Sequence, residues 1–538
     1  MNENKRKKLP IGEDNFKKLI EGGYYFVDKS EFIIDILRED SSVVLITRPR
    51  RFGKTLNMSM LKYFLDISGD YRYLFKDLKI SKRQTKDIED MRNNTPVIYL
   101  TFKDCKSVDK AGLISSIHNE IVRECSKLFT LEEIKQYELD KLINTDTTKY
   151  LKYAIANMSK ALYTKYNKDV VVLIDEYDTP ILSAYEYGYY KDLLPFFSVF
   201  YGSGLKGNEY LKRALLTGIN RVAKNNIFSG LNNLTVYTVN SSKFSNRFGL
   251  LEREVKELFK HFGIDYSLEV KKYYNGYKFS SNRVFNPWSV LSYIHKSSLE
   301  PYWVNTANPE ILIDKVLNLG EDALVLLNDV LLKDNVLINY DVDNMIFEES
   351  NLDTFIGLMI NSGYLTVEQQ TSYNEGYIKI PNEEVRIAIN KLLNSCLLSD
   401  GRSTITKMRQ SLIKQDFDMF NKVLEKMLID NFSYHDMKEY AYHVFMNTLM
   451  LHVTDIYDLH SNLEMGLGRS DIYLKPKRPG LKPIIFELKK SNSDKDLQKD
   501  AQEGLNQISK KKYDYNVKDC VHIGMAFYGK SVCMVRNV

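Results

Sequence analysis

The sequence predicts an α/β protein whose N-terminal part contains a parallel sheet with helices on both faces. Short apolar runs rich in β-branched residues recur along this part, and such runs are typical of buried strands. Segments with helical spacing of apolar residues separate the runs, and this alternation favours parallel strands joined by helices. The strand-forming stretches are Val43–Ile46, Pro96–Phe102, Val170–Ile174, Arg213–Arg221 and Leu234–Val239.

Composition places the chain among soluble globular proteins. Its 538 residues suffice for two to four domains of about 100–200 residues each. Hydrophobic residues make up 44% and charged residues 27%, and the net charge of 75 − 70 = +5 is too small to identify a partner. The 5 cysteines are scattered without the spacing of a metal or redox motif, which favours reduced thiols and a cytoplasmic protein.

Neither end of the sequence nor its interior predicts a membrane protein. No apolar run reaches the roughly 18 residues of a transmembrane helix. The basic start Lys5–Lys8 is not followed by the apolar segment of a signal peptide. We therefore expect no membrane partner.

A strand, a basic loop and a helix follow one another between Val43 and Leu65. The loop ends in Gly53-Lys54-Thr55, and the N–H groups and dipole of a helix start favour an anion. Lys54 would reach the terminal phosphates of a nucleotide, and the Thr55 hydroxyl would hold Mg²⁺. Arg48 stands where the general pattern has glycine, so an ordinary basic turn is the alternative.

The third strand ends in two acids. The carboxyl ends of strands carry the chemistry in open α/β sheets. Asp175 would hold Mg²⁺ through water, and Glu176 would orient and deprotonate the attacking water. The alternative is an acidic loop that caps the next helix, and we interpret Asp178 as such a cap before Pro180.

Polar residues also end the fourth strand. If this strand lies between the two motif strands, Thr217, Asn220 and Arg221 are candidates for sensing the γ-phosphate, and Arg221 would supply charge in cis. A turn with a surface arginine explains the pattern equally well. The predicted nucleotide-binding residues are Arg50, Arg51, Phe52, Gly53, Lys54, Thr55, Leu56, Asp175, Asn220 and Arg221.

The pattern changes near Gly249. We predict three parts: residues 1–248 with the sheet, a mainly helical lid and connector at 249–403, and a C-terminal domain at 404–538. Ser399–Ser403 is predicted as a linker. Trp288 and Trp303 are interpreted as packing anchors rather than as base-stacking platforms.

The C-terminal domain carries a third group of polar residues, predicted on a hairpin with strands at 462–474 and 483–489. Glu487 and Lys489 are two residues apart and share one face of a strand, and Asp471 can lie beside them. Two carboxylates near a lysine suit metal-assisted hydrolysis, in which the carboxylates hold Mg²⁺ and the lysine orients water. The alternative is a solvated or salt-bridged hairpin without a metal.

Two helices flank this hairpin. The first, at 434–452, has Glu439, His443 and Asn447 on one face. The second carries Gln502 and Gln507, which we predict within reach of substrate or of metal-bound water. Residues 469–518 include 13 Lys and Arg and 7 Asp and Glu. This local net charge of +6 suits binding to a phosphate backbone.

These motifs resemble two known groups of proteins. The stretches Arg48–Leu56, Leu173–Asp178, Thr217–Ile219 and Tyr274–Tyr277 are similar to the bacterial AAA-ATPase-like family. Gly468–Ile472 with Phe486–Lys489 resembles the PD-(D/E)XK nuclease superfamily.

The resemblance implies an α/β fold with an N-terminal P-loop NTPase sheet, a helical lid or connector, and a C-terminal restriction-endonuclease-like domain. It implies that Arg48 belongs to the family's own loop, that Lys54 and Thr55 bind phosphate and Mg²⁺, and that Asp175 and Glu176 form the second motif. It also implies a nuclease core of Asp471, Glu487 and Lys489. The metal ligands implied are Thr55, Asp175, Asp471, Glu487 and the upstream acid Glu439.

We therefore expect a cytoplasmic ATPase, with ATP and Mg²⁺ as cofactors, coupled to a metal-dependent DNA endonuclease. The resemblance suggests a role in defence or mobile-element biology, and homo-oligomers are compatible with it. The alternative is a nucleotide-dependent switch whose inactive nuclease-like domain only binds DNA or a protein.

Overall fold

The computed structural model forms two compact units. The N-terminal unit comprises residues 1–307 and 337–385, and the C-terminal unit comprises residues 308–336 and 386–538. Residues 249–403, predicted as one connector, are thus divided between the two units. The residues described below are 7–83, 85–144, 148–222, 227, 233–304, 310–343, 351–397, 401–431 and 439–537.

A parallel five-stranded sheet is the centre of the N-terminal unit. Its strands stand in the order β2-β3-β4-β1-β5, and every neighbouring pair is parallel. The fourth strand lies between the two motif strands, as the sensor hypothesis required. The strands are β1 (Val43–Thr47), β2 (Val97–Thr101), β3 (Val170–Asp175), β4 (Leu211–Gly218) and β5 (Leu234–Tyr237). The predicted α/β class and its strands are confirmed.

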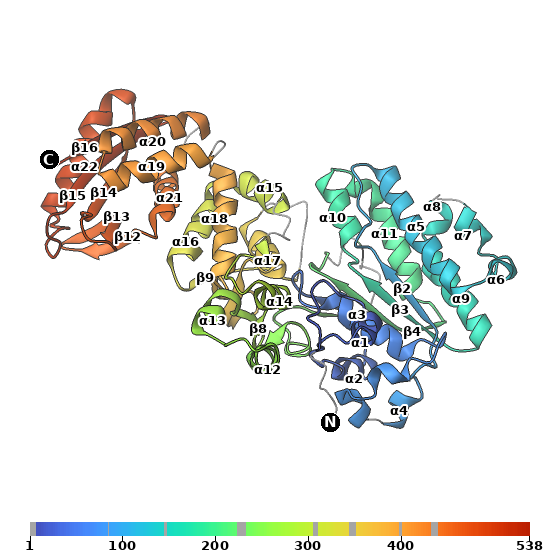
Figure 1. Ribbon diagram of the computed structural model, residues 1–538. Helices are drawn as coiled ribbons and strands as arrows, with labels where there is room; N and C mark the ends of the chain where they lie inside the picture. The colour runs from blue at the N-terminus through green and yellow to red at the C-terminus, as the bar shows by residue number, and fades with distance from the viewer. Residues whose placement is uncertain are drawn as a thin grey trace. The chain divides into compact units, whose positions relative to one another are not determined.

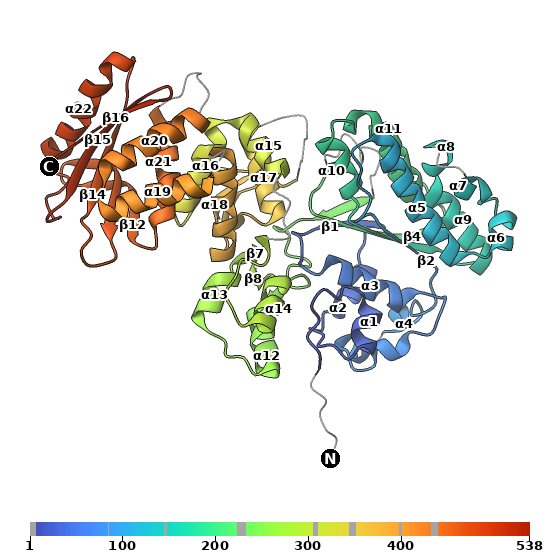
Figure 2. The ribbon, with the colours of Figure 1, turned by 45° about the horizontal axis from the view of Figure 1, so that its top comes forward.

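Helices cover both faces of this sheet (Figure 2). One face carries α1 (Phe16–Glu21), α2 (Glu31–Leu37), α3 (Lys54–Leu65) and α4 (Lys86–Glu89). The other face carries α5 (Lys110–Leu128), α9 (Ala154–Tyr166), α10 (Thr179–Glu186) and α11 (Tyr190–Leu205). Short helices follow α5: α6 (Leu131–Gln136), α7 (Asp140–Asn144) and α8 (Thr148–Leu151). The motif strands β1 and β3 are buried along their whole length, which explains why every residue before the polar last one is apolar.

Smaller elements complete the N-terminal unit (Figure 1). They include two three-stranded sheets, in the orders β6-β8-β7 and β10-β11-β9. The strands are β6 (Leu250–Leu251), β7 (Tyr277–Phe279), β8 (Asn282–Phe285), β9 (Val336–Asn339), β10 (Thr366–Ser372) and β11 (Glu375–Lys379). The helices are α12 (Glu252–Phe262), α13 (Leu268–Tyr274), α14 (Pro287–Lys296) and α17 (Leu352–Ser362).

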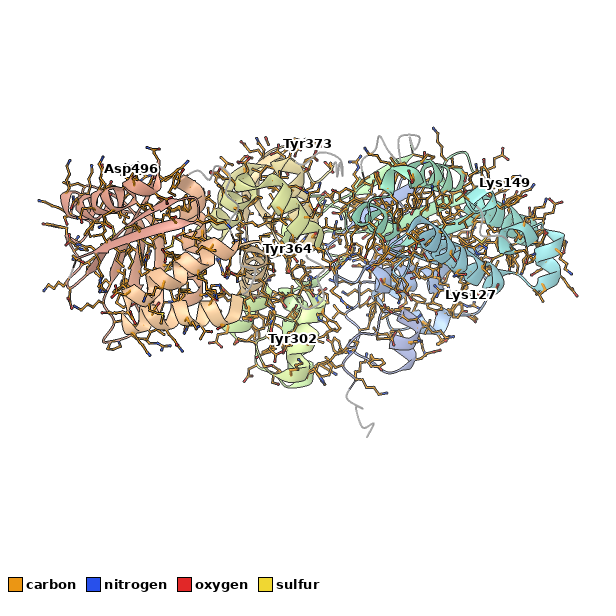
Figure 3. All side chains as sticks on the ribbon, turned by 90° about the horizontal axis from the view of Figure 1, so that it is seen from above. Lys127, Lys149, Tyr302, Tyr364, Tyr373 and Asp496 are labelled. Atoms are coloured by element: carbon orange, nitrogen blue, oxygen red, sulfur yellow. The ribbon has the colours of Figure 1, made fainter. Side chains whose placement is uncertain are left out.

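The two tryptophans occupy different environments. Trp303 is 1% exposed and packs edge-on against Tyr364, which Figure 3 labels, with ring centroids 5.1 Å apart. The prediction of a packing anchor is therefore confirmed for Trp303. Trp288 is only half-buried and lines the cavity described below.

The C-terminal unit contains a mixed sheet with helices on its two faces, together with further helices. The sheet order is β12-β13-β14-β15-β16, and only the β14–β15 pair is parallel. The strands are β12 (Tyr457–Met465), β13 (Gly468–Pro476), β14 (Ile484–Lys490), β15 (Val521–Tyr528) and β16 (Ser531–Arg536). The helices are α15 (Glu310–Leu319), α16 (Glu321–Leu332), α18 (Glu383–Leu397), α19 (Gly401–Lys414), α20 (Phe417–Asn431), α21 (Glu439–Met450) and α22 (Leu497–Lys510).

Two sequence predictions for this unit need correction. The stretch 462–474 is not one strand, because Gly466 turns the chain with φ 55° and separates β12 from β13. The linker prediction at 399–403 is wrong where it can be checked, since α19 begins at Gly401, and residues 399 and 400 lie outside the described residues. The start of the predicted helix at 434–438 also lies outside them.

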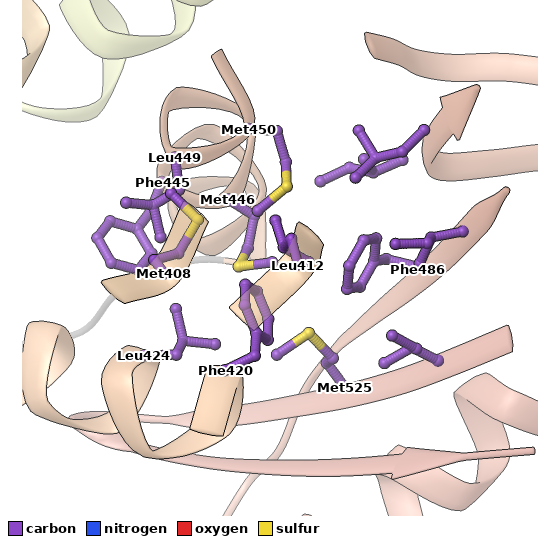
Figure 4. Packing of buried hydrophobic residues seen from close by; sticks show 14 of the residues in the cluster. Met408, Leu412, Phe420, Leu424, Phe445, Met446, Leu449, Met450, Phe486 and Met525 are labelled. Atoms are coloured by element: carbon purple, nitrogen blue, oxygen red, sulfur yellow. The ribbon is translucent and has the colours of Figure 1, made fainter. Parts of the chain in front are cut away.

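Side chains on alternate positions of the C-terminal sheet pack on different helices. Ile484, Phe486 and Met525 join a cluster with Met408 and Phe420 from α19 and α20 (Figure 4). This cluster is the largest part of the core of the C-terminal unit among the described residues. Burying each such side chain contributes about 1.5–3 kcal/mol to stability. The intervening residues, including Ile485, pack against α22 through Ile508. This alternation leaves Glu487 and Lys489 on the α22 face.

Within the part of the chain that the structure describes, no helix combines the length and the apolar character needed to cross a membrane.

Candidate nucleotide-binding and nuclease sites

The basic loop after β1 is a tight turn that ends in the first residue of α3. Two of its residues have left-handed backbone, Arg51 with φ 68° and Gly53 with φ 85°. A Cβ at Gly53 would meet no atom within 4 Å, so the turn requires glycine for its backbone conformation rather than for space. Phe52 is buried and packs against Tyr277 and Phe279, with ring centroids 4.9 and 5.2 Å apart.

Arg48 points away from the loop that it precedes. Its Nη1 donates to the carbonyls of Thr47 at 2.7 Å and Tyr237 at 3.1 Å, which are the last residues of β1 and β5. Its guanidinium lies over Phe248 and Phe279, 5.4 and 5.1 Å from their ring centroids. Burial lowers the pKa of Arg48 to about 9. The arginine replaces glycine here because its side chain fits a separate aromatic pocket.

Lys54 lies folded over the same loop. Its Nζ donates to the carbonyls of Arg48 and Pro49, at 2.8 and 2.9 Å. Burial lowers its pKa, and the negative charges of Glu176 and Asp175 oppose that shift. The ammonium group is thus held at the loop, between its carbonyls and the acids of β3.

Thr55 and Asp175 meet, as the sequence predicts. The Thr55 hydroxyl donates to Asp175 Oδ2 at 2.7 Å, and the Thr217 hydroxyl donates to Oδ1 at 2.5 Å. Burial raises the pKa of Asp175, while both hydroxyls favour its ionised form. Thr217, a sensor candidate, therefore contacts the carboxylate that the sequence predicts to bind the metal.

Glu176 adopts an unusual backbone conformation beside Asp175. Its φ of 53° lies in the left-handed region, which costs a non-glycine residue roughly 1–2 kcal/mol. Its carboxylate accepts a hydrogen bond from the Thr179 hydroxyl at 3.1 Å and lines the cavity. Strain of this kind is typical of functional positions.

Asp178 has a role that the sequence did not indicate. It stands at the N-cap position of α10, but its side chain makes no capping bond. Its Oδ2 accepts instead from the N–H groups of Ile219 and Asn220, at 3.0 and 2.9 Å. Burial raises its pKa to about 6. The cap interpretation is wrong, and Asp178 joins the end of β3 to the end of β4.

The other two of the three predicted sensor residues, Asn220 and Arg221, lie outside the cavity lining. Asn220 is 2% exposed. Arg221 makes an ion pair with Asp343, at 3.5 Å between Nη1 and Oδ1. Asp343 also accepts a hydrogen bond from Tyr373, labelled in Figure 3, at 2.8 Å. The structure thus engages Arg221 with the segment before α17 rather than with the phosphate loop.

One cavity of about 530 Å³ surrounds the phosphate loop. Residues Arg50–Asn57 and Glu176 line it, so the loop residues predicted to bind nucleotide are brought together. Its volume lies within the range of about 300–1,000 Å³ that is typical of ligand pockets. Lys103 and Lys106, which follow β2, add positive charge to the lining and were not predicted.

Asp471 and Glu487 meet on the α22 face of the C-terminal sheet. The register pairs Ile472 with Phe486 in antiparallel strands, which places the two acids opposite each other at the next position. Asp471 Oδ2 accepts from the Leu488 N–H at 2.7 Å. Burial, followed by the charge of Asp471, raises the pKa of Glu487 to about 7, and burial also raises that of Asp471.

Lys489 and Gln507 complete this cluster. Lys489 Nζ lies 3.3 Å from Glu487 Oε1 and donates to Gln507 Oε1 at 2.8 Å. Gln507 Nε2 donates to Glu487 Oε1 and to the Tyr513 hydroxyl, the latter at 3.2 Å. Tyr513 was missed, because a tyrosine after the end of a helix has no distinctive spacing.

Comparison with known proteins finds a family model for the region around each candidate site. Residues 10–228 match a family model described as a predicted AAA-ATPase, and residues 437–537 match one for the PD-(D/E)XK nuclease superfamily. The chain carries an AAA-ATPase-like domain followed by a PD-(D/E)XK nuclease-superfamily domain.

Two individual proteins are similar to this chain. An uncharacterised protein in the vnfD 5′ region of Azotobacter chroococcum mcd 1 is 28% identical over 425 residues, covering 77% of this chain and 75% of that protein. The Walker-type ATPase PABY2304 of Pyrococcus abyssi is 12% identical, with a TM-score of 0.37, and the match covers 72% of this chain and 99% of that one.

Two predicted residues of the nuclease-superfamily domain lie away from the acidic pair. Gln502 is exposed and bonds Asn506 one turn along α22, at 3.1 Å. Five residues of an α-helix turn through about 500°, so Gln502 and Gln507 point in directions about 140° apart. Glu439 is exposed at the start of α21.

His443 and Asn447, predicted on the same face of α21 as Glu439, are buried. His443 Nε2 lies 3.2 Å from the Asp471 carbonyl, and Asn447 donates to the Ser461 hydroxyl at 3.0 Å. Among the described residues, no three His, Cys, Asp or Glu side chains are grouped closely enough to hold a metal ion. Glu439 therefore does not join Asp471 and Glu487 in such a group.

The acidic pair nevertheless has the chemistry of a cation site. Glu487 is 2% exposed, and its Oε2 has no hydrogen-bond partner among the described residues. A buried carboxylate oxygen without a partner is costly, and a hard cation would satisfy it. In the AAA-ATPase-like domain, Thr55 and Asp175 likewise offer oxygen atoms next to the phosphate loop.

Proposed function

We propose that the AAA-ATPase-like domain binds ATP with Mg²⁺ and hydrolyses it. The observation that supports this most directly is that Lys54, Thr55 and Glu176 line one cavity, with Asp175 hydrogen-bonded to Thr55. Lys54 binds the terminal phosphates in place of the loop carbonyls, and Thr55 with Asp175 holds the metal. The ion would neutralise charge on the phosphate oxygens.

Glu176 is the proposed general base. It lines the cavity and comes one residue after the metal-binding Asp175. The Thr179 hydroxyl orients its carboxylate. In this role Glu176 takes a proton from the attacking water.

We further propose that the nuclease-superfamily domain cleaves DNA with a divalent cation. Asp471 and Glu487 hold the ion, which would activate water and stabilise the leaving oxygen. Lys489 and Gln507 position the water and the phosphate from the same face. The local charge of +6 around these residues supports contact with a phosphate backbone.

A second candidate function is a nucleotide-dependent switch with a nuclease-like domain that only binds DNA or protein. One observation favours it: Lys489 and Gln507 already bond Glu487, and no third acid joins the pair among the described residues. A protonated Glu487 with these partners would form a stable cluster without a metal.

Plasmid cleavage with Mg²⁺, with and without ATP, separates the two functions. A nuclease is expected to nick or linearise DNA, and Asp471→Asn and Gln507→Ala are expected to lose this activity. Gln502→Ala is a matched control, because Gln502 is exposed on the same helix. DNA binding without cleavage by the wild type would support the switch. ATP-dependent cleavage would suit defence against foreign DNA or a role in mobile-element biology.

A further inference from the structure

The cavity around the phosphate loop has two chemically different kinds of lining. Near the carboxyl ends of β2 and β3 the lining is charged, with Lys103, Asp104, Lys106 and Glu176. A phosphate chain with its metal needs this charged lining and the loop itself. A second set of lining residues is aromatic or aliphatic and has no use in phosphate binding. These residues are Tyr25, Val27, Leu258, Pro287, Trp288 and Leu291.

Trp288 is the largest of these side chains, and its backbone is fixed. It lies in the first turn of α14, after Pro287, whose ring presets the helical backbone. The Asn286 side chain caps the helix by accepting from the Trp288 N–H at 2.9 Å. The indole is half-buried, so part of its ring faces the cavity.

A flat charged group of the phosphate loop already lies on this indole. The Arg51 guanidinium is 4.6 Å from the ring centroid of Trp288. Arg51 is exposed and has a left-handed backbone with φ 68°. Trp288 therefore lies within one side-chain length of the loop, and its ring accepts a planar partner by stacking.

We infer that Trp288 and its apolar neighbours form a base-recognition subsite for a nucleoside triphosphate. The nucleobase stacks on the indole beside Arg51, while the phosphates lie on the loop at Lys54. A purine is favoured because its larger π-face stacks over more of the indole. This inference rests on the proposed ATP binding and adds the residue that distinguishes a nucleotide from a bare polyphosphate.

Trp303 provides a matched control. It is the other of the 2 tryptophans in the sequence, it is 1% exposed, and it is not part of the cavity lining. Replacing it with phenylalanine keeps an aromatic ring against Tyr364 and leaves Trp288 as the sole indole. Fluorescence of the Trp303→Phe protein then reports on the cavity alone.

The test compares ATP with inorganic triphosphate, each with Mg²⁺, by titration calorimetry on the full chain. We expect Trp288→Leu to bind ATP about 5- to 150-fold more weakly, the range for loss of one base–aromatic stack. Its affinity for triphosphate should be unchanged, because triphosphate has no base. Trp288→Phe should recover part of the ATP affinity, and Trp303→Phe should bind both ligands as the wild type does.

Fluorescence gives an independent measurement. In the Trp303→Phe protein, ATP should quench or shift the emission of Trp288, and triphosphate should have a much smaller effect. Equal affinities of the wild type for ATP and triphosphate, with no loss in Trp288→Leu, would overturn the subsite and leave the phosphate loop intact. Failure of the wild type to bind either ligand would overturn the proposed nucleotide binding and the subsite with it. Circular dichroism of each variant verifies its fold.

Discussion

At the scale of single residues, Lys54 has a buried ammonium group whose hydrogen bonds go to carbonyl oxygens of the phosphate loop. These two hydrogen bonds are 2.8 and 2.9 Å long. Burial without a counter-charge in contact lowers its pKa. A phosphate would supply the missing anion, so binding gains both a charge-assisted hydrogen bond and relief of this penalty.

Lys54→Ala is expected to weaken ATP binding by about 10- to 150-fold, since a hydrogen bond to a charged group contributes about 1.5–3 kcal/mol. Isothermal titration calorimetry measures this change. Lys62→Ala is the matched control, because Lys62 lies on the same helix but outside the cavity lining. Unchanged affinity in Lys54→Ala would move the anion contact to Arg50 and Arg51.

Glu176→Gln should separate binding from hydrolysis. Glutamine keeps the shape and the hydrogen bond from Thr179, but it cannot accept the proton of water. ATP affinity should stay near that of the wild type, and turnover should fall about 10²–10⁴-fold, the usual contribution of a general base. Phosphate release at the wild-type rate in this variant would assign the base elsewhere.

At the scale of elements, Asp178 is one of the residues that join the ends of β3 and β4. Asp178 accepts from two N–H groups after β4, and a Cβ at Gly218 would lie 2.6 Å from Asp178 Oδ1. The glycine thus allows the strand end to approach a buried carboxylate. The contact holds Thr217 in place to bond Asp175.

Gly218→Ala is expected to destabilise the protein by about 1–3 kcal/mol through overpacking. Gly202→Ala in α11 is the control, because a Cβ there would meet nothing within 4 Å. Inside a helix, alanine is more stable than glycine by about 0.5–1 kcal/mol, so this variant should not lose stability. Urea unfolding measures both changes. Equal stability of the two variants would mean that the β3–β4 contact adjusts without cost.

A second contact between elements depends on pH. Glu384, at the start of α18, accepts from the Ser289 hydroxyl of α14 at 2.8 Å and from the backbone N–H of Trp303 at 2.6 Å. Burial raises its pKa from 4.5 to about 7. Between these values the folded protein keeps a proton that the unfolded chain loses.

The free energy of unfolding should therefore fall as pH rises from about 4.5 to 7, by up to about 1.4 kcal/mol per pH unit from this group. Glu384→Gln removes the titration and keeps one acceptor oxygen, which can serve both donors because the Trp303 backbone N–H and the Ser289 hydroxyl both lie within hydrogen-bond distance of Oε1. Urea midpoints of the wild type and the variant, compared at pH 5 and pH 8, measure the difference. Parallel pH profiles of the two proteins would contradict the assignment.

At the scale of the whole molecule, the two candidate sites lie in different compact units. Asp471→Asn should abolish cleavage and leave ATP affinity and the thermal unfolding of the N-terminal unit unchanged. Lys54→Ala should remove any dependence of cleavage on ATP while keeping the acidic pair intact. Cleavage assays and calorimetry on both variants test this. Loss of ATP binding in Asp471→Asn would contradict independent sites.

The sequence alone determined much of the architecture. All five strands of the N-terminal sheet were predicted. The signal was strongest for β1 and β3, because a fully buried parallel strand needs an apolar run. The motifs of the phosphate loop and of β3 located Lys54, Thr55, Asp175 and Glu176, since local backbone chemistry fixes their spacing. The spacing of Glu487 and Lys489 likewise placed both on one strand face.

Only the tertiary structure decided which partner each polar residue has. Asp178 looked like a helix cap, and it bonds the end of β4, which lies some forty residues later in the chain. Arg221 pairs with Asp343, and Trp288 from the region predicted as a connector lines the phosphate-loop cavity. Such contacts depend on how distant segments pack, and side-chain periodicity within one element carries no information about them.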